Sequence, residues 1–225
     1  MITKPSLMVR FFLLLLLIMG SCLQAQEELS ELQDPWQIGL VYSLDELRPL
    51  STFTVDHFHW IDYTEDQTNL SIGMSIMRKV HPMWSLRSGL VYSQRDVSGV
   101  YSCDFCDPTG EVFTLPIRYL SIPVLIRYQI PLHKFSVYAE TGVSTAFFLG
   151  ISKRNPPIIG SKAPGSAMIE SISGLGLTFR ISDRISTMLG YQYTQTLTHL
   201  DRSYGFDWKF RFHGIQAGIS SRLGK

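Results

Sequence analysis

Charge is scarce in this sequence and nearly balanced in sign. Charged residues make up 17% of the 225 residues, and the formal net charge is +1 at pH 7. Such a chain has no overall field that would gather nucleic acid or acidic substrates, so neither is an expected partner. The length fits one domain with a core of its own, and nothing in the composition indicates a second.

Long apolar runs are missing after the N-terminus. Lys4 and Arg10 precede an unbroken apolar run from Phe11 to Met19. This run is about half as long as a membrane-spanning helix, which requires about 20 apolar residues. The pattern predicts a secretory signal peptide over residues 1–25. A membrane anchor and a lipoprotein cleavage site at Cys22 are the alternatives.

A chain without such a helix can cross a bilayer only as a closed sheet, because helices and closed barrels alone satisfy every backbone polar group in hydrocarbon. Eight segments alternate between apolar side chains and small or polar ones, as membrane strands do. The predicted outward faces are Trp36, Ile38, Leu40 and Tyr42; Leu70, Ile72, Met74 and Ile76; Trp84, Leu86, Leu90 and Tyr92; Leu120, Ile122, Val124, Ile126, Tyr128 and Ile130; Phe135, Val137, Ala139, Thr141, Val143, Thr145 and Phe147; Leu175, Leu177, Phe179 and Ile181; Leu189, Tyr191 and Tyr193; and Ile215, Ala217 and Ile219.

Short and long connections alternate strictly between these segments. The short ones are residues 80–83, 131–134 and 182–184, and the long ones are 44–68, 96–115, 151–167 and 196–209. A soluble β-sandwich has no reason for this pattern, whereas an outer-membrane barrel has tight periplasmic turns and long extracellular loops. The sequence therefore predicts an all-β fold, an eight-stranded antiparallel up-and-down transmembrane β-barrel over residues 36–225. A short acidic periplasmic segment, residues 26–35, precedes it, and the expected location is the outer membrane of a Gram-negative bacterium.

Aromatic side chains on the predicted outward faces fall near both ends of the strands. This placement is typical of the two interfacial girdles of a membrane barrel. The residues near the short turns are Trp36, Trp84, Tyr128, Phe135 and Phe179, and those near the long connections are Tyr42, Tyr92, Phe147 and Tyr193.

The predicted inner face is rich in glycine and serine, but it also holds charges that a dry core would not bury without pairing. These charges are Arg87, Arg127, Glu140, Glu170, Arg180 and Arg222. Eight strands enclose only enough space for side chains, so we expect one polar network to fill the lumen and exclude an open pore. Arg127 and Glu140 are expected to pair diagonally across the hairpin at 131–134.

The stretch Leu115–Tyr128, LPIRYLSIPVLIRY, resembles the central strand motif of the PorT-like outer-membrane β-barrel family of Bacteroidota. The resemblance extends from Trp36 to Leu223 and includes Gly190–Tyr193 and Gly214–Gly218. It implies the barrel fold and a link to secretion or envelope function, although many members of the family have no assigned activity. Such barrels often end in an aromatic residue that the assembly machinery recognises, whereas this chain ends in Arg222–Lys225.

Two cysteines, Cys103 and Cys106, lie three apart in the second long connection. In an oxidising compartment this spacing predicts a local disulfide that stiffens the loop. A redox pair is one alternative, and a zinc site completed by His57 and His59 is another. We expect no metal and no cofactor.

A barrel enzyme that modifies lipid would need serine, histidine and a carboxylate close together near the outer leaflet. The phase of His213 places it on the lipid-facing side beside Ile215, with Tyr193 on the adjacent strand. We interpret His213 as an interfacial residue and expect no catalytic residue. A lipid A hydrolase or acyltransferase is the alternative.

Aromatic residues in the long connections indicate either a contact surface or side chains that pack the loops and rest among lipid headgroups. They are Phe58, Trp60, Tyr63, Tyr101, Phe105, Tyr204, Phe206 and Trp208. The predicted function is a non-enzymatic, monomeric barrel that contacts outer-membrane lipid and serves as a membrane scaffold or interaction platform, with a protein partner bound through the loops. A small-solute channel is the third hypothesis.

Overall fold

The computed structural model describes residues 36–49, 53–56, 59–63, 68–103, 111–151, 167–198 and 210–223, which contain ten strands. The strands are β1 (Trp36–Pro49), β2 (Phe53–Asp56), β3 (His59–Tyr63), β4 (Thr68–His81), β5 (Trp84–Cys103), β6 (Glu111–Leu132), β7 (Phe135–Ile151), β8 (Ala167–Arg180), β9 (Ile185–Thr196) and β10 (Phe210–Arg222). Among the described residues, no helix has the length and apolarity needed to cross a membrane.

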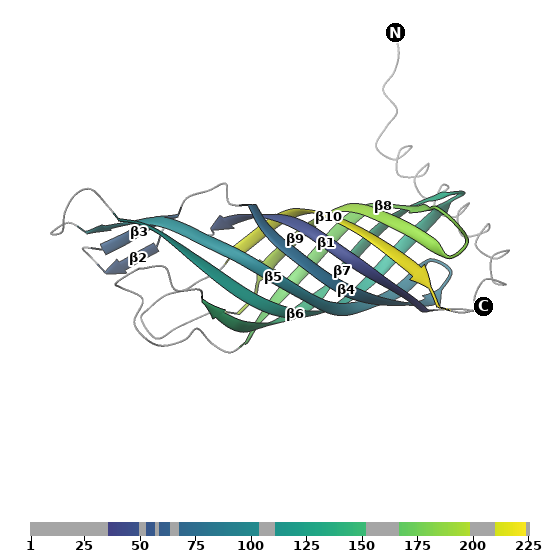
Figure 1. Cartoon of the computed structure of the whole chain (residues 1–225), viewed down its shortest axis with the longest axis horizontal. Coiled ribbons are helices and arrows are strands. Elements are labelled where there is room, and N and C mark those ends of the chain that lie inside the picture. The colour runs from purple at the N-terminus through teal and green to yellow at the C-terminus, as the bar shows by residue number, and fades with distance from the viewer. Residues whose placement is uncertain are drawn as a thin grey trace, which may run out of the picture.

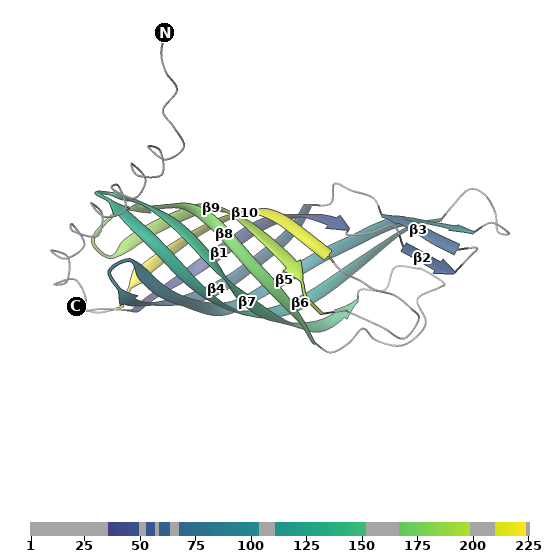
Figure 2. The ribbon, with the colours of Figure 1, turned by 180° about the vertical axis from the view of Figure 1, so that it is seen from behind.

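Eight of these strands close into a barrel (Figures 1 and 2). Each barrel strand pairs antiparallel with the next one along the chain, in the order β1, β4, β5, β6, β7, β8, β9 and β10. The last strand then pairs with the first, from Gln37 opposite Arg222 to Pro49 opposite Phe210. The predicted eight-stranded antiparallel up-and-down barrel is therefore confirmed.

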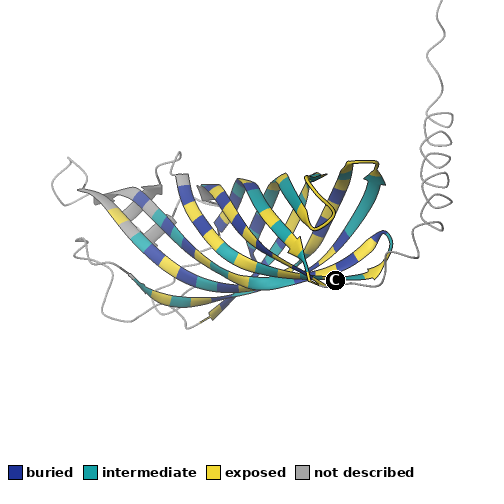
Figure 3. Cartoon of the chain, turned by 45° about the vertical axis from the view of Figure 1, so that its right-hand side comes forward, coloured by how far each residue is buried: buried dark blue, intermediate teal, exposed yellow. Residues whose placement is uncertain are grey.

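Side-chain burial alternates along the barrel strands, as Figure 3 shows. Leu175, Leu189 and Ile215 on the outside expose 63%, 58% and 61% of their surface. Arg127 and Glu140 on the inside expose only 2% and 5%. A soluble protein does the reverse, because it buries its apolar side chains and exposes its charges. An apolar exterior of this extent requires an apolar surrounding such as a bilayer.

The short connections lie where the sequence predicts them, at residues 82–83, 133–134 and 181–184. The prediction of a loop over residues 96–115 is wrong. β5 continues to Cys103 and β6 begins at Glu111, and the two segments pair from Asp96 opposite Pro116 to Tyr101 opposite Glu111. Valines and aromatics favour strands here, and cross-strand pairing outweighs the charge and glycine that interrupt the apolar pattern.

The connection predicted at 44–68 is also partly strand. β1 reaches Pro49, and the short strands β2 and β3 follow it. β3 pairs with the outer end of β5, from Gly99 to Cys103, and β2 pairs with β3. We call β2, β3 and the paired ends of β5 and β6 (Asp96–Cys103 and Glu111–Pro116) the arm. Figures 1 and 2 show it extending beyond the other strands at the long-connection end.

Two glycines make room for a large side chain inside the barrel. Gly176 and Gly190 face each other on β8 and β9, and Tyr138 on β7 lies opposite Gly176. A Cβ atom at Gly176 would lie 2.7 Å from the Tyr138 hydroxyl oxygen, and one at Gly190 would lie closer still. Real Cβ contacts do not occur at such distances. The two glycines therefore allow Tyr138 to point across the lumen.

Gly190→Ala should lower the free energy of unfolding by about 1–3 kcal/mol, because an added methyl group overpacks a filled interior. Adding Tyr138→Phe should recover part of this loss, since it removes the hydroxyl that the methyl group meets. Reversible urea unfolding in lipid vesicles measures both. Gly174→Ala is the matched control, because its nearest contact is 3.1 Å away. Equal losses at positions 174 and 190, or no recovery in the double variant, would contradict this packing.

Candidate functional site

The lumen holds a layer of three ion-paired residues. We call it the lower layer, because it lies closer to the short turns than the second ion pair described below. Glu140 on β7 accepts hydrogen bonds from Arg87 of β5 and Arg127 of β6. Arg87 Nη2 lies 2.5 Å from Glu140 Oε1, and Arg127 Nη2 lies 2.7 Å from Oε2. All three side chains are buried. Arg127 also stacks over the ring of Tyr138, with its Cζ atom 4.0 Å from the ring centroid.

Arg127 and Glu140 form the predicted pair, but the register places them directly opposite each other and not diagonally. The reason lies in the turn. His133 and Lys134 alone connect the strands, and His133 has a φ of 59°, so Leu132 pairs directly with Phe135. A two-residue turn of this kind fixes the register of the whole hairpin.

A second ion pair, the upper layer, lies closer to the long connections. Arg95 on β5 donates to Glu170 on β8, with Nη1 2.5 Å from Oε1. The Arg95 guanidinium also lies 4.0 Å from the ring centroid of Phe212 and 5.4 Å from that of Tyr119. Sequence reasoning missed Arg95. The sequence does indicate that Arg95 points inward, because it lies an even number of positions after Arg87 and Ser93 on the same strand. It was overlooked because a loop was expected to begin at the next residue.

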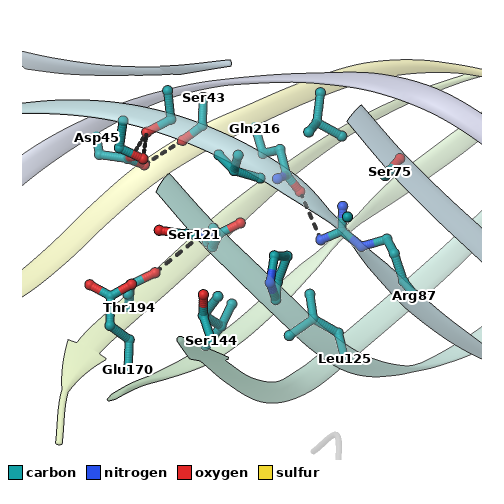
Figure 4. Close-up of a pocket in the computed structure, with 18 of the residues that line it drawn as sticks. Ser43, Asp45, Ser75, Arg87, Ser121, Leu125, Ser144, Glu170, Thr194 and Gln216 are labelled. Carbon is teal, nitrogen blue, oxygen red and sulfur yellow. Dashed lines mark hydrogen bonds between the residues drawn. The ribbon is translucent and has the colours of Figure 1, made fainter. Parts of the chain in front are cut away.

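A small chamber separates the two layers (Figure 4). Its volume is about 50 Å³, and Ser121, Ser144 and Thr194 line it together with residues of both layers. The hydroxyl oxygens of Ser121 and Ser144 are buried and have no hydrogen-bond partner among the described residues. A cavity of this size next to unpaired hydroxyl groups can hold ordered water. On the facing wall, Asp45 accepts hydrogen bonds from Ser43 and Ser71.

The structure does not bring the six predicted lumen charges into one network. Arg87, Arg127 and Glu140 form the lower layer, whereas Glu170 belongs to the upper one. Arg180 and Arg222 line a separate cavity at the short-turn end of the barrel. The lumen is therefore divided by height into an upper layer, a chamber, a lower layer and a cavity at its base.

The nine predicted girdle residues, from Trp36 to Tyr193, lie on outward-facing positions of the barrel strands. Near the short turns, the rings of Trp84 and Tyr128 lie 4.9 Å apart, and those of Phe135 and Phe179 lie 4.8 Å apart. The Arg78 guanidinium lies 5.2 Å from the ring centroid of Trp36. At the other end of the strands, Tyr42, Tyr92, Phe147 and Tyr193 occupy the corresponding positions.

His213 on β10 lies on the outside, near the long connections. Tyr193 is directly opposite it on β9, with ring centroids 5.1 Å apart, and its Nδ1 atom shares a hydrogen bond with the Tyr191 hydroxyl. On the other side, the register places Glu46 of β1 opposite His213. Sequence reasoning missed Glu46, because pairing between the first and last strands leaves no local signal. Residues 36–223, where described, contain no group of three or more potential metal ligands.

The predicted disulfide and zinc site fall largely outside the described residues, which include neither Cys106 nor His57. The backbone register does place His59 of β3 opposite Cys103 of β5. Of the loop aromatics, Trp60, Tyr63 and Tyr101 belong to arm strands, and the others lie outside the described residues.

Comparison with solved structures shows what kind of fold this is. The outer membrane protein OprG from Pseudomonas aeruginosa matches with a TM-score of 0.55 and 11% identity over 85% of this chain and 98% of OprG. The chain has the fold of a small outer-membrane β-barrel. Neisserial surface protein A matches with a TM-score of 0.49 and 12% identity over 84% of this chain and 97% of that one. Ail, the attachment invasion locus protein of Yersinia pestis, matches with a TM-score of 0.46 and 14% identity over 84% of this chain and 99% of Ail.

No family model matches this chain, and no curated protein matches it in sequence. The three solved proteins named above share 11–14% identity with the chain, so the similarity establishes the fold and not the activity.

Proposed function

We propose that this chain is a non-enzymatic, monomeric barrel of the Gram-negative outer membrane that presents an interaction platform at its long-connection end. The exposed apolar belt supports the location. It is bounded at both ends by aromatic residues, such as Trp84 and Tyr92, which prefer the membrane–water interface. The neighbouring phospholipid and lipopolysaccharide chains would cover the outward leucines and isoleucines.

The observation that carries the proposal is the arm. β5 and β6 have 20 and 22 residues, whereas about 9–11 suffice to cross a bilayer. Their outer ends carry β3 and β2, and among the described residues β2 pairs with β3 alone. An edge strand has free backbone donors and acceptors, to which a strand of another protein can add. The platform is thus a sheet fixed to the barrel.

The filled lumen argues against the channel hypothesis. The two ion-pair layers cross the interior, and the chamber between them has a volume of only about 50 Å³. Eight strands leave no further width for a pore. Steady conductance of the purified barrel in planar bilayers would contradict this view.

Site-specific crosslinking in intact cells tests the platform. A photoreactive amino acid at Phe53 or His59, on the arm strands, should capture one defined partner. The same probe at Asp183, in a turn at the other end, is the control. A probe at Tyr101, on the arm segment of β5, should capture the same species, and this capture should vanish when residues 50–67 are replaced by a glycine–serine linker of equal length. No capture from the arm, or the same capture from Asp183, would overturn the proposal.

The resemblance to PorT-like barrels supports a partner from a secretion apparatus or another envelope assembly. Such a partner would meet the arm outside the lipid, where sheet addition needs no apolar surface. Identification of the protein captured at Phe53 decides whether this part of the proposal holds.

One observation favours the second candidate function, a lipid-modifying enzyme. Glu46 lies opposite His213 on the outward face, so a carboxylate and a histidine are neighbours near the rim. The contact described for Nδ1 of His213 is the Tyr191 hydroxyl, which fits an interfacial aromatic cluster.

His213→Ala should therefore leave the mass spectrum of lipid A unchanged, because we assign His213 to the girdle. His81→Ala, an exposed histidine at the other end of the barrel, is the matched control. A lipid A species altered by the first variant and unaffected by the second would favour the enzyme and contradict the proposal.

A further inference from the structure

A pocket opens on the outer face of the barrel, between β4 and β5 at their long-connection ends. We call it the rim pocket. Its volume is about 200 Å³, and the residues that line it are Asn69, Leu70 and Ile72 of β4 and Tyr92, Gln94 and Asp96 of β5. The side chains of Leu70, Ile72 and Tyr92 are exposed on the outward face, so the rim pocket opens toward the lipid and not toward the lumen.

The rim pocket spans the level at which the membrane ends. Tyr92 belongs to the outer girdle, and the register places the apolar Ile72 directly opposite it. Gln94 and Asp96 lie two and four residues beyond Tyr92, which is about 7 and 13 Å further along the strand. The rim pocket is therefore apolar on its membrane side and polar on its outer side. A ligand that fills it must be amphipathic and must come from the outer leaflet.

The polar side of the rim pocket is held by hydrogen bonds. The buried Asn69 accepts a hydrogen bond from the backbone N–H of Asp96, with 2.7 Å between Oδ1 and N. The Nδ2 atom of Asn69 is also buried and has no hydrogen-bond partner among the described residues. Such a donor is costly to leave unpaired. An oxygen-rich ligand in the pocket that Asn69 lines is one source of the acceptor.

A carboxylate, an amide and an aromatic ring come together in the rim pocket. Asp96 accepts a hydrogen bond from Gln94, with 3.3 Å between Oδ1 and Nε2. A carboxylate offers about four acceptor sites, so this bond leaves room for hydroxyl donors of a ligand. The exposed ring of Tyr92 offers a flat apolar surface with a polar tip. These groups together suit a sugar, whose hydroxyls form hydrogen bonds and whose C–H face packs on a ring.

A cation borders the rim pocket on the side of β6. The register places Arg118 directly opposite Gln94, and the Arg118 side chain is exposed. Residues opposite each other on neighbouring strands have Cβ atoms about 5 Å apart. A guanidinium group binds phosphate oxygens through paired hydrogen bonds. A phosphate attached to the sugar would therefore reach Arg118.

We propose that the rim pocket binds the phosphorylated sugar headgroup of lipopolysaccharide. The sugar lies on Tyr92 and forms hydrogen bonds with Gln94 and Asp96, its phosphate faces Arg118, and an acyl chain covers Leu70 and Ile72. A phospholipid fits less well, because its phosphate would meet the carboxylate of Asp96 and it has no pyranose ring to pack on Tyr92. The inference rests on the proposed location in the outer membrane and is independent of the arm.

Native mass spectrometry of the chain from residue 26 onward, folded in detergent and titrated with lipid A, tests the site. Lipid A is the acylated, phosphorylated disaccharide of lipopolysaccharide, and one molecule should stay bound per chain. Tyr92→Leu with Gln94→Leu should weaken binding by about tenfold, because it removes a ring contact and a hydrogen bond. The matched control is Tyr193→Leu with Gln195→Leu, which makes the same changes at the same spacing on β9, across the barrel, and should leave binding unchanged.

A second measurement needs no variant. Lipid A added to the unmodified, isotope-labelled chain should shift the amide resonances of Leu70, Gln94 and Asp96, and leave those of Tyr193 and Gln195 in place. No retention of lipid A, equal weakening by the two double variants, or shifts of equal size on both sides of the barrel would overturn the proposal.

Competition with phospholipid separates the sugar from the lipid chains. An equal concentration of phosphatidylglycerol or phosphatidylethanolamine should leave lipid A bound to the native chain. Displacement by either phospholipid would contradict the assignment of the rim pocket to a sugar. A chain that binds no lipid A but still captures one partner from the arm would lose this site and keep the proposed platform.

Discussion

Glu140→Gln should lower the free energy of unfolding by about 3–5 kcal/mol, the usual cost of leaving buried charge without its partner. Glu140 contacts both Arg87 and Arg127, and its side chain is only 1% exposed. A neutral amide can accept one hydrogen bond from each guanidinium, but it cannot balance two positive charges inside the barrel. Urea unfolding in lipid vesicles measures the loss.

Two controls separate this pairing from a general loss of charge. Asp183→Asn removes a carboxylate from an exposed turn, and its effect should stay within about 0.5 kcal/mol. Arg127→Met should cost less in the Glu140→Gln background than in the native chain, because the cation it removes is then already uncompensated. If Arg127→Met costs the same in both backgrounds, the two residues are not coupled and the lower layer does not act as a unit.

Leu175→Arg should destabilise the barrel by about 2–4 kcal/mol, whereas Ile181→Arg should cost only about 0–1 kcal/mol. Leu175 lies near the middle of β8, with 63% of its surface exposed, and Ile181 lies in the turn that follows, with 57% exposed. The two side chains are equally open, so the expected difference arises from their depth in the bilayer. The same vesicle-based unfolding measures both.

If water surrounded the protein, neither substitution should change its stability much, because both side chains are mostly exposed and an arginine there would be solvated. Both substitutions would then stay within about 0.5 kcal/mol of the native chain. Equal effects at positions 175 and 181 would contradict the membrane assignment of the outer face.

The sequence predicts this fold because one physical rule acts on every strand. Each second residue faces lipid, so a segment such as Leu120–Ile130 reveals its outward and inward faces without knowledge of its neighbours. The short turns are equally visible, since they interrupt the alternation. Sequence reasoning fails in the arm, where β5 and β6 extend beyond the membrane. Apolar side chains no longer occupy every second position there, so the pattern that identifies a membrane strand is missing.

The candidate sites depend on register, which the sequence does not reveal. Arg95 and Glu170 are 75 positions apart, and Glu46 and His213 meet only because the first and last strands close the barrel. Arg180 and Arg222 line the cavity at the short-turn end, and the height of each along the lumen follows from the stagger of its strand. The stagger of a barrel is a property of the whole sheet, so no single segment encodes it.

Sedimentation velocity of the purified chain from residue 26 onward, with and without detergent, tests the central claim most directly. An apolar belt that faces outward predicts a folded monomer in detergent and aggregation once detergent is removed. A compact, folded monomer in plain buffer would contradict it, because such a chain would have to bury its leucines and isoleucines away from water.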